Sequence, residues 1–266
     1  MSAAPDRHAA GDPTEVAAGL DPGLEAGLEA GLEAELEADP QGFAARAAAE
    51  LEDADAGQVL AWAGRTFGTG RGGLVVTAAM GDTVLAHLAG RTVPRVDVLF
   101  VDTGYHFAET LGTLDAVRAT YPVTVRVVRP AQDLAAHEAQ RGVLHRTDPD
   151  ACCAVRKVAP LDAGLSGYRA WATGLRRDES PTRAGTPVVG WDARRRLVKL
   201  APLARWTDDD VAAYLSVHPD VLLNPLLQTG YRSIGCAPCT RPIAPGEDAR
   251  AGRWAGTAKT ECGIHR

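Results

Sequence analysis

The chain has 266 residues and lacks the features of an exported, membrane-bound or disulfide-built protein. No apolar run approaches the length of a membrane span. No basic stretch followed by an apolar segment opens the sequence, so no signal peptide is evident. The 5 cysteines are too few for a disulfide framework in a chain of this length. We therefore expect a cytoplasmic protein without membrane contacts, in a compartment that keeps thiols reduced.

Lysine and aromatic residues are also scarce. Aromatic residues make up 5% of the chain, and the lysines are Lys157, Lys199 and Lys259. Basic clusters interleaved with aromatic residues are absent, so nucleic acid is not an expected partner. Residues 1–56 hold 14 acidic residues and 2 arginines, whereas residues 57–266 hold 20 acidic and 26 basic residues. The second part is mildly basic, which suits a small anionic substrate.

The acidic front of the chain contains the repeat GLEAGLEAGLEAELEA between residues 14 and 40. Glycine at such a spacing weakens a helix, and the segment has little apolar mass to bury. We predict that residues 1–40 form an acidic, low-complexity tail that is disordered or a frayed helix. Residues 41–225 would then form the folded domain, and residues 226–266 a separate C-terminal segment.

Short apolar runs alternate with helical patterns through the middle of the chain. The runs predict strands at 73–79, 96–101, 123–128, 171–173 and 198–200. Helices are predicted within 43–67, from 83 to 88, at 109–119 and at 207–215. This alternation predicts an α/β fold with a parallel sheet flanked by helices. Beyond Pro225 we expect mostly loops.

The cysteines fall into two pairs and one isolated residue. Cys152 and Cys153 are adjacent, whereas Cys236 and Cys239 form a C-x-x-C pair. A C-x-x-C pair is a common half-site for zinc or an iron–sulfur cluster. Adjacent side chains on a helix point about 100° apart, which is awkward for one tetrahedral zinc ion. A cluster offers each cysteine a different iron, so the spacing favours [4Fe–4S] over zinc.

Three segments end or follow predicted strands, where parallel sheets bind ligands. The turn from Ala78 to Asp82 could hold a phosphate or sulfate group at a helix N-terminus. Asp102 and Thr103 end the second strand and could contact a ribose or adenine. Gly174, Arg176 and Arg177 follow another strand and could bind an anion. Each segment also has an ordinary reading, as an unliganded turn, a capping aspartate or a solvated basic loop.

The fifth cysteine, Cys262, lies near the C-terminus among cations. Arg250, Arg253, Lys259 and His265 are its basic neighbours, whereas Glu261 opposes them. Nearby cations favour the thiolate, which is the nucleophilic form of cysteine. We therefore predict that Cys262 is a catalytic nucleophile in a mobile segment.

Four motifs resemble those of a known family. The segment CCAVRKVAPL at 152–161 resembles the C-C-x-x-R-K-x-x-P-L motif of assimilatory adenylyl-sulfate reductases. The segment GCAPCT at 235–240 resembles their second cluster motif. The segment KTECGIH at 259–265 is similar to the K-x-E-C-G-I/L-H signature of the wider sulfonucleotide reductase family. The segments LFVDTGYHF at 99–107 and WATGLRR at 171–177 also match, so the resemblance covers about residues 45–266.

The resemblance implies an adenine nucleotide α-hydrolase-like (Rossmann-like) fold and one [4Fe–4S] cluster per chain. The implied ligands are Cys152, Cys153, Cys236 and Cys239. The implied reaction converts adenosine 5′-phosphosulfate and reduced thioredoxin into sulfite, AMP and oxidised thioredoxin, through an S-sulfocysteine on Cys262. The repulsion between thiolate and sulfate would be offset by Lys157, Arg250, Arg253 and His265.

One position departs from the family pattern. The family usually has serine in the first strand–turn, where this chain has Thr77-Ala78-Ala79. Thr77 could supply the missing hydroxyl, or backbone N–H groups could suffice. Two other functions compete with the implied one. A 3′-phosphoadenylyl-sulfate reductase would typically lack the four cluster cysteines, although these cysteines are compatible with an enzyme that uses both substrates. A non-enzymatic metal-binding module would leave the ECGIH tail without a purpose.

Overall fold

The computed structural model describes residues 31–257 and 259–265. Within this part of the chain, one six-stranded sheet has the order β3-β2-β1-β4-β6-β5. All neighbours pair in parallel except β5 and β6, which pair antiparallel. The strands are β1 (Leu74–Thr77), β2 (Asp97–Val101), β3 (Thr124–Val128), β4 (Ala170–Thr173), β5 (Val189–Asp192) and β6 (Leu197–Leu200). The predicted α/β fold class is confirmed.

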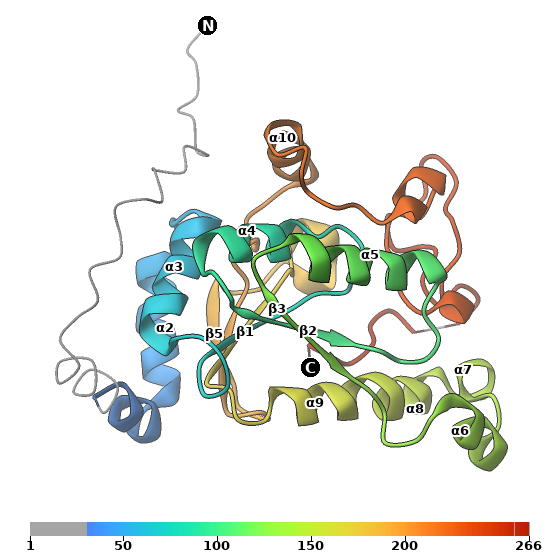
Figure 1. Cartoon of the computed structure of the whole chain (residues 1–266), viewed down its shortest axis with the longest axis horizontal. Helices are drawn as coiled ribbons and strands as arrows, with labels where there is room; N and C mark the ends of the chain where they lie inside the picture. Colours follow the sequence, from blue (N-terminus) through green and yellow to red (C-terminus); the bar gives the residue numbers. More distant parts are fainter. Residues whose placement is uncertain (1–30, 258, 266) are drawn as a thin grey trace, which may run out of the picture.

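Helices cover both faces of this sheet (Figure 1). One face carries α4 (Val84–Thr92) and α5 (Ala108–Thr120), with α3 (Ala56–Phe67) beside them. The opposite face carries α9 (Ala159–Leu165). The helix α2 (Pro40–Leu51) packs near the antiparallel edge, where it contacts β5.

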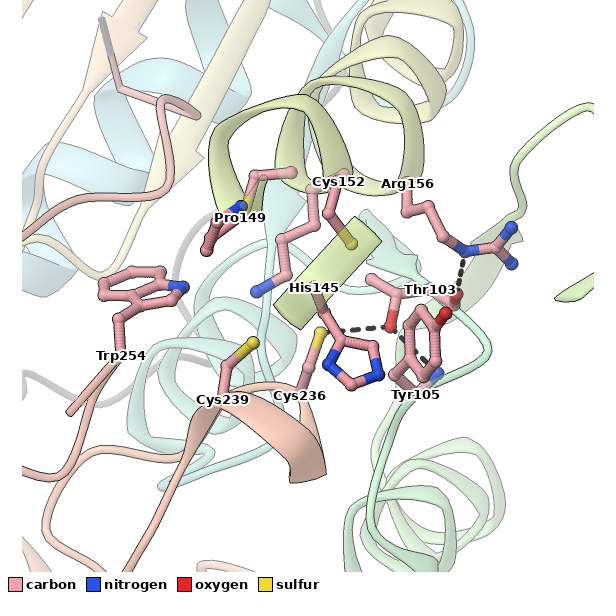
Figure 2. A pocket seen from close by; sticks show the side chains of 11 residues that line it. Thr103, Tyr105, His145, Pro149, Cys152, Arg156, Cys236, Cys239 and Trp254 are labelled. Atoms are coloured by element: carbon pink, nitrogen blue, oxygen red, sulfur yellow. Dashed lines mark hydrogen bonds between the residues drawn. The ribbon is translucent and has the colours of Figure 1, made fainter. Parts of the chain in front are cut away.

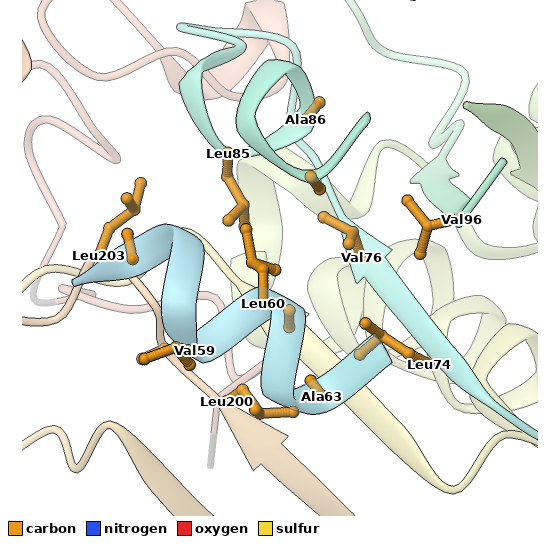
Figure 3. Close-up of a cluster of buried hydrophobic side chains, with 14 of the residues drawn as sticks. Val59, Leu60, Ala63, Leu74, Val76, Leu85, Ala86, Val96, Leu200 and Leu203 are labelled. Atoms are coloured by element: carbon orange, nitrogen blue, oxygen red, sulfur yellow. The ribbon is translucent and has the colours of Figure 1, made fainter. Parts of the chain in front are cut away.

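The main hydrophobic core lies between the sheet and α3 and α4. Figure 3 shows Leu60 of α3 beside Val76 of β1 and Leu85 of α4. Leu60 and Val76 are each 0% exposed. Because successive strand residues point to opposite faces, Val75 faces a second, smaller cluster with Trp171. Burial on both faces explains why the central strands read as continuous apolar runs.

The chain between β3 and β4 forms a series of short helices that the sequence patterns did not indicate. They are α6 (Leu134–Arg141), α7 (Leu144–Thr147), α8 (Pro149–Cys153) and a π-helical turn at Ala154–Val158 that runs into α9. Asp148 caps α8 by accepting a hydrogen bond from the Ala151 amide at 2.9 Å. Pro149 suits the first turn because its missing N–H needs no partner there. This helix carries the adjacent cysteines.

The C-terminal part of the described chain is rich in loops, as expected. Helix α10 (Asp208–Val217) begins at the predicted cap, where Thr207 and Asp210 bond each other's backbone. The remaining helical turns before and after it are short 3₁₀ segments. They are η3 (Arg177–Glu179), η4 (Pro181–Arg183), η5 (Pro225–Thr229) and η6 (Ala237–Cys239).

Most of the predicted acidic tail, residues 1–30, lies outside the described residues. Residues 31–38 of the predicted tail are helical in the structure, in line with the second of the two alternatives given for it. Leu32 and Leu36 are four residues apart and therefore share one face, which packs against the main core. Among the described residues, no helix is long and apolar enough to cross a membrane.

Candidate active site

A cavity of about 420 Å³ lies at the carboxyl ends of the central strands. One wall comes from the turn at Ala78–Asp82, which follows β1, and from Thr173 to Arg176, which follows β4. Asn224 holds the first of these turns, since its side chain donates to the Met80 carbonyl and its amide to the Gly81 carbonyl, both at 2.9 Å. We call this side of the cavity the sheet wall.

The polar groups of the sheet wall are partly committed to the fold. The Thr77 hydroxyl donates to the Ala172 carbonyl at 3.2 Å, so its proton is used within the sheet. Asp82 lines the cavity, and desolvation by the surrounding protein raises the pKa of its carboxyl. Its oxygen accepts from the Val84 amide at 3.3 Å. The Thr77 hydroxyl and the Asp82 carboxyl are therefore both engaged in contacts within the fold.

Gly174 and Arg176 also line the cavity. The Arg176 guanidinium donates a hydrogen bond to Asp208 at 2.6 Å, and the Arg176 side chain is 15% exposed. The hydrogen bond from Arg176 lowers the pKa of the Asp208 carboxyl and outweighs the effect of its desolvation, which raises that pKa. An anion in the cavity would thus meet an arginine that is already oriented by a carboxylate.

The opposite side of the cavity is built by the chain from Asp248 to His265, which we call the tail wall. It contributes Arg250, Arg253, Cys262 and His265 to the lining. The Arg253 guanidinium stacks over the Trp254 ring at 4.5 Å and donates to the Ser233 hydroxyl at 3.3 Å. Burial lowers the pKa of Arg253, while the nearby thiol of Cys262 raises it. The predicted nucleophile and two predicted cations therefore share one cavity.

Lys157 connects this cavity with the paired cysteines. Its side chain lines both spaces. Burial lowers the pKa of Lys157, but Cys236, Cys262 and Cys153 raise it, and the net shift is upward. The ammonium group therefore stays charged between the isolated cysteine and the paired ones.

All four paired cysteines line one small cavity beside Lys157. Figure 2 shows the sulfur atoms of Cys152, Cys236 and Cys239 directed into this space from α8 and from the ends of η6. Each is a free cysteine. Burial, followed by the charge of Cys153 and the other neighbours, raises the pKa of Cys152 to about 12. Four thiolates could coexist here only beside positive charge.

A buried arginine supplies part of that charge. Arg156 is 3% exposed and donates to the Thr103 carbonyl at 2.6 Å and to the Gln132 carbonyl at 3.3 Å. Its guanidinium also lies over the Tyr105 ring at 5.6 Å. Among the described residues no carboxylate forms a salt bridge with Arg156, so an anionic partner in the cysteine cavity would balance a buried charge.

The cysteines do not converge on one point. Within residues 31–257 and 259–265, no three His, Cys, Asp or Glu side chains are grouped so as to hold a single metal ion. This arrangement is consistent with the divergence expected of adjacent cysteines on a helix. A polynuclear group would give each thiolate its own iron and would not require three side chains to meet at a single ion.

Three residues predicted for nucleotide contact lie elsewhere. Asp102 caps its own turn through the Gly104 amide at 3.0 Å and pairs with Arg129 at 3.0 Å. Thr103 lines the cysteine cavity, where its hydroxyl lies 3.3 Å from the Cys236 sulfur. Arg177 turns away from the cavity and forms a forked pair with Glu52 at 2.7 and 3.1 Å.

His265 differs from the cation that the sequence predicted. Its ring stacks on Trp171 with centroids 5.7 Å apart and planes at 19°. Burial and the neighbouring cations Lys199 and Arg183 lower the pKa of His265 well below its ordinary value. The imidazole is therefore neutral near pH 7, and it anchors the end of the tail wall rather than adding charge to it.

Further residues shape the cavity. Arg183 lines it from the end of η4, and the sequence patterns missed Arg232, which lines it from a loop, and Trp254, which lies between it and the cysteine cavity. Lys259 pairs with Asp150 on α8 and thereby ties the tail wall to the helix of the adjacent cysteines. No periodicity marks such loop residues, and the only available signal was the concentration of arginine in the loops after β4.

Comparison with known proteins identifies the group to which this architecture belongs. Residues 73–242 match the model of the phosphoadenosine phosphosulfate reductase domain. The chain belongs to this family. The matched region includes both strand-end segments of the sheet wall and all four paired cysteines. Cys262 lies beyond it, in the part of the tail wall that the family model does not cover.

Close relatives within the phosphoadenosine phosphosulfate reductase family extend the match. A Streptomyces coelicolor protein named adenosine 5′-phosphosulfate reductase is 59% identical over 226 residues, which cover 85% of this chain and 94% of the relative. A protein of the same name from Mycolicibacterium smegmatis is 52% identical, over 84% of this chain and 93% of the relative.

Solved structures confirm the family fold. A phosphoadenylyl-sulfate reductase from Candida auris, solved as a phosphate complex, matches with a TM-score of 0.66 and 29% identity. The match covers 76% of this chain and 97% of that one. A Candida glabrata FMN adenylyltransferase in complex with FAD and pyrophosphate matches with a TM-score of 0.51 and 16% identity, over 83% of this chain and 73% of that one. This second likeness concerns the fold alone.

Proposed function

We propose that the protein reduces adenosine 5′-phosphosulfate to sulfite and AMP, with electrons from thioredoxin or a similar dithiol protein. The reaction serves sulfate assimilation, in the reducing environment of the cytoplasm. The observation that carries the proposal is the shared cavity, in which Cys262 faces the strand-end turns together with Lys157, Arg250 and Arg253. The name shared by relatives up to 59% identical supports the choice of substrate.

The first chemical step is a transfer of the sulfo group. The Cys262 thiolate attacks the sulfur atom of the bound sulfate group, a sulfur–sulfur bond forms, and the bond from sulfur to the bridging oxygen breaks. AMP leaves with that electron pair. Both reacting groups are anionic, so cations must lower the repulsion between them. Lys157 and Arg253 lie within electrostatic reach of Cys262 and serve this purpose, together with Arg250.

The second step releases the product. A thioredoxin thiolate attacks the Cys262 sulfur, and sulfite leaves with the electron pair of the sulfur–sulfur bond. The second thioredoxin thiol then attacks the mixed disulfide, which restores Cys262 as a thiol and leaves thioredoxin oxidised. Two electrons pass from the dithiol to the sulfo group. Cys262 must therefore face the nucleotide in one step and the partner protein in the next.

Cys152, Cys153, Cys236 and Cys239 would hold one [4Fe–4S] cluster. Their shared cavity, the charge repulsion among them and the buried Arg156 without a carboxylate partner among the described residues support this assignment. The cluster core would offset part of the negative charge of the four thiolates, with Lys157 and Arg156 balancing the remainder, and the cluster would hold α8 to the loop of η6. The electrons of the reaction come from the dithiol and pass through Cys262.

The test is sulfite release from the two candidate sulfonucleotides by anaerobically purified protein. We expect kcat/KM for adenosine 5′-phosphosulfate to exceed that for its 3′-phosphorylated form, with release dependent on reduced thioredoxin. A clear preference for the 3′-phosphorylated nucleotide would overturn the proposed substrate. The absence of sulfite release from either nucleotide would overturn the proposed activity.

A further inference from the structure

The residue before the proposed nucleophile makes the densest set of ion pairs in the tail wall. The Glu261 carboxylate accepts two hydrogen bonds from Arg183, at 3.0 and 3.1 Å. It accepts a third from Arg250 at 3.1 Å, and Arg250 also donates to the Thr260 carbonyl at 3.0 Å. Forked pairs of this kind fix orientation as well as distance.

These contacts are shielded from solvent. The side chains of Arg183, Glu261 and Arg250 are 13%, 18% and 16% exposed. Burial raises the pKa of Glu261, but the hydrogen bonds and charges of the arginines lower it, and the net shift is downward. The carboxylate is therefore ionised at neutral pH. Its ion pairs with the arginines are less screened by solvent than an ordinary surface pair.

The two arginines belong to different parts of the chain. Arg183 ends η4 and is also paired with Glu179 of η3, so it is held in place independently of the tail. Arg250 contacts the same carboxylate from the turn that opens the tail wall. The carboxylate thus joins the last segment of the chain to the loop that follows β4, directly beside Cys262.

On the other side of Cys262 the backbone takes a conformation that favours glycine. Gly263 has φ of +81°, a conformation that residues with a side chain rarely adopt. His265 then stacks on Trp171. Cys262 therefore lies in the chain between two residues that are held in place, Glu261 by ion pairs and His265 by its ring contact. Of the two, the ionic one lies next to the nucleophile and beside the cations that an anionic substrate would meet.

We propose that Glu261 is a positioning residue that latches Cys262 over the substrate cavity through Arg183 and Arg250. This inference rests on the proposed function and deepens it. The latch holds the thiol in place for sulfo transfer. Its opening turns the same sulfur outward for attack by thioredoxin. Glu261 hence assists the first step and is not needed in the second.

The inference is tested first by the alkylation of Cys262 with iodoacetamide in the substrate-free holoenzyme, read by peptide mass spectrometry. Glu261→Asp keeps the charge but withdraws the carboxylate by one methylene, and Glu261→Gln removes the charge. We expect both variants to raise the alkylation rate about tenfold, as the loss of a charge-assisted hydrogen bond predicts. Glu179→Gln is the matched control, because it removes a carboxylate from the same arginine but leaves the latch. Its rate should stay within about twofold of the wild-type rate.

Single-turnover measurements separate the two steps. In Glu261→Asp, AMP release should slow about tenfold, whereas sulfite discharge by reduced thioredoxin should keep its wild-type rate. A wild-type alkylation rate in Glu261→Asp, or an equal increase in Glu179→Gln, would refute the latch. Equal slowing of both steps would also refute it. The alkylation result does not depend on any reaction, so the latch can fail while sulfite release by the wild-type enzyme upholds the proposed function.

Discussion

The two walls of the active-site cavity are stabilised by different forces. The sheet wall extends from strands whose residues, such as Val76 and Ala172, are 0% exposed within the core. The described part of the tail wall contains no helix or strand. It is held by ion pairs of Glu261 and Lys259 and by the stacking of His265 on Trp171.

This difference matches the role that we propose for each wall. Hydrophobic burial fixes the sheet wall in one conformation, which suits the binding of a nucleotide by backbone groups. Ion pairs can open without disrupting the core, and elements that move are drawn from the less stable parts of a fold. A nucleophile that visits two partners belongs on the second kind of wall.

The largest expected effect comes from replacing single cysteines, one in the cysteine cavity and one in the tail wall. Cys236→Ser should remove the proposed cluster and abolish sulfite release, because the serine cannot replace a buried thiolate ligand. Cys262→Ser is the matched control, and it should abolish release with the iron content unchanged. Visible spectra and analyses for iron and acid-labile sulfide measure this. Stoichiometric zinc without sulfide in the wild-type protein would contradict the cluster.

The next largest effect is expected from a substitution in the hydrophobic core that supports the sheet wall. Leu60→Ala opens a cavity under β1 and should lower the free energy of unfolding by about 2–5 kcal/mol. Leu111→Ala, at a position that is 39% exposed on α5, should change it by less than about 0.5 kcal/mol. Denaturant unfolding measures both. Equal losses would mean that α3 does not support the sheet as described.

A smaller effect concerns the pH dependence of stability beside the tail wall. Burial lowers the pKa of Lys199 from 10.5 to about 8, and its ammonium lies 5.2 Å from the centre of the Trp171 ring. Between these two pH values the unfolded chain binds more protons than the folded one, so stability should rise with pH across that window. Lys199→Met should remove this contribution to the slope. Denaturant unfolding at a series of pH values measures this. The same dependence of the free energy of unfolding on pH in the variant and the wild-type protein would contradict the prediction.

The smallest effect is expected at the front of the chain. Deletion of residues 1–30 should leave sulfite release within a few-fold of the full-length rate, since the acidic repeat lies outside the resemblance. Deletion of residues 1–38 also removes Leu32 and Leu36, which pack against the core, and should therefore lower the free energy of unfolding. Turnover and unfolding of both truncations measure this. A large loss of turnover in the shorter truncation, with full iron content, would show that the acidic segment takes part in the reaction.

The sequence predicted the elements whose signal is hydrophobic. Five strands follow from apolar runs, because the central strands are buried on both faces. The edge strand β5 (Val189–Asp192) was missed, since it is four residues long, contains Gly190 and has only its first residue fully buried. The helix α8, which carries Cys152 and Cys153, was missed because its 5 residues are too few to show a period.

The placement of single polar residues was less predictable. Arg176 has extended backbone whereas Arg177 begins the 3₁₀ turn η3, and their side chains diverge, one to the cavity and the other to Glu52. Thr103 reaches the cysteine cavity because the turn after β2 carries it toward Cys236. The neutral state of His265 depends on Lys199 and Arg183, which are distant in sequence.

The most direct test of the central claim is the mass of the C-terminal peptide after reaction with adenosine 5′-phosphosulfate in the absence of thioredoxin. We predict one added sulfo group on Cys262 and about one AMP released per active site, because the four other cysteines are the proposed ligands of the cluster. Reduced thioredoxin should then discharge the adduct as sulfite, and Cys262→Ser should not form it. An adduct on another residue, or its formation by Cys262→Ser, would contradict the account.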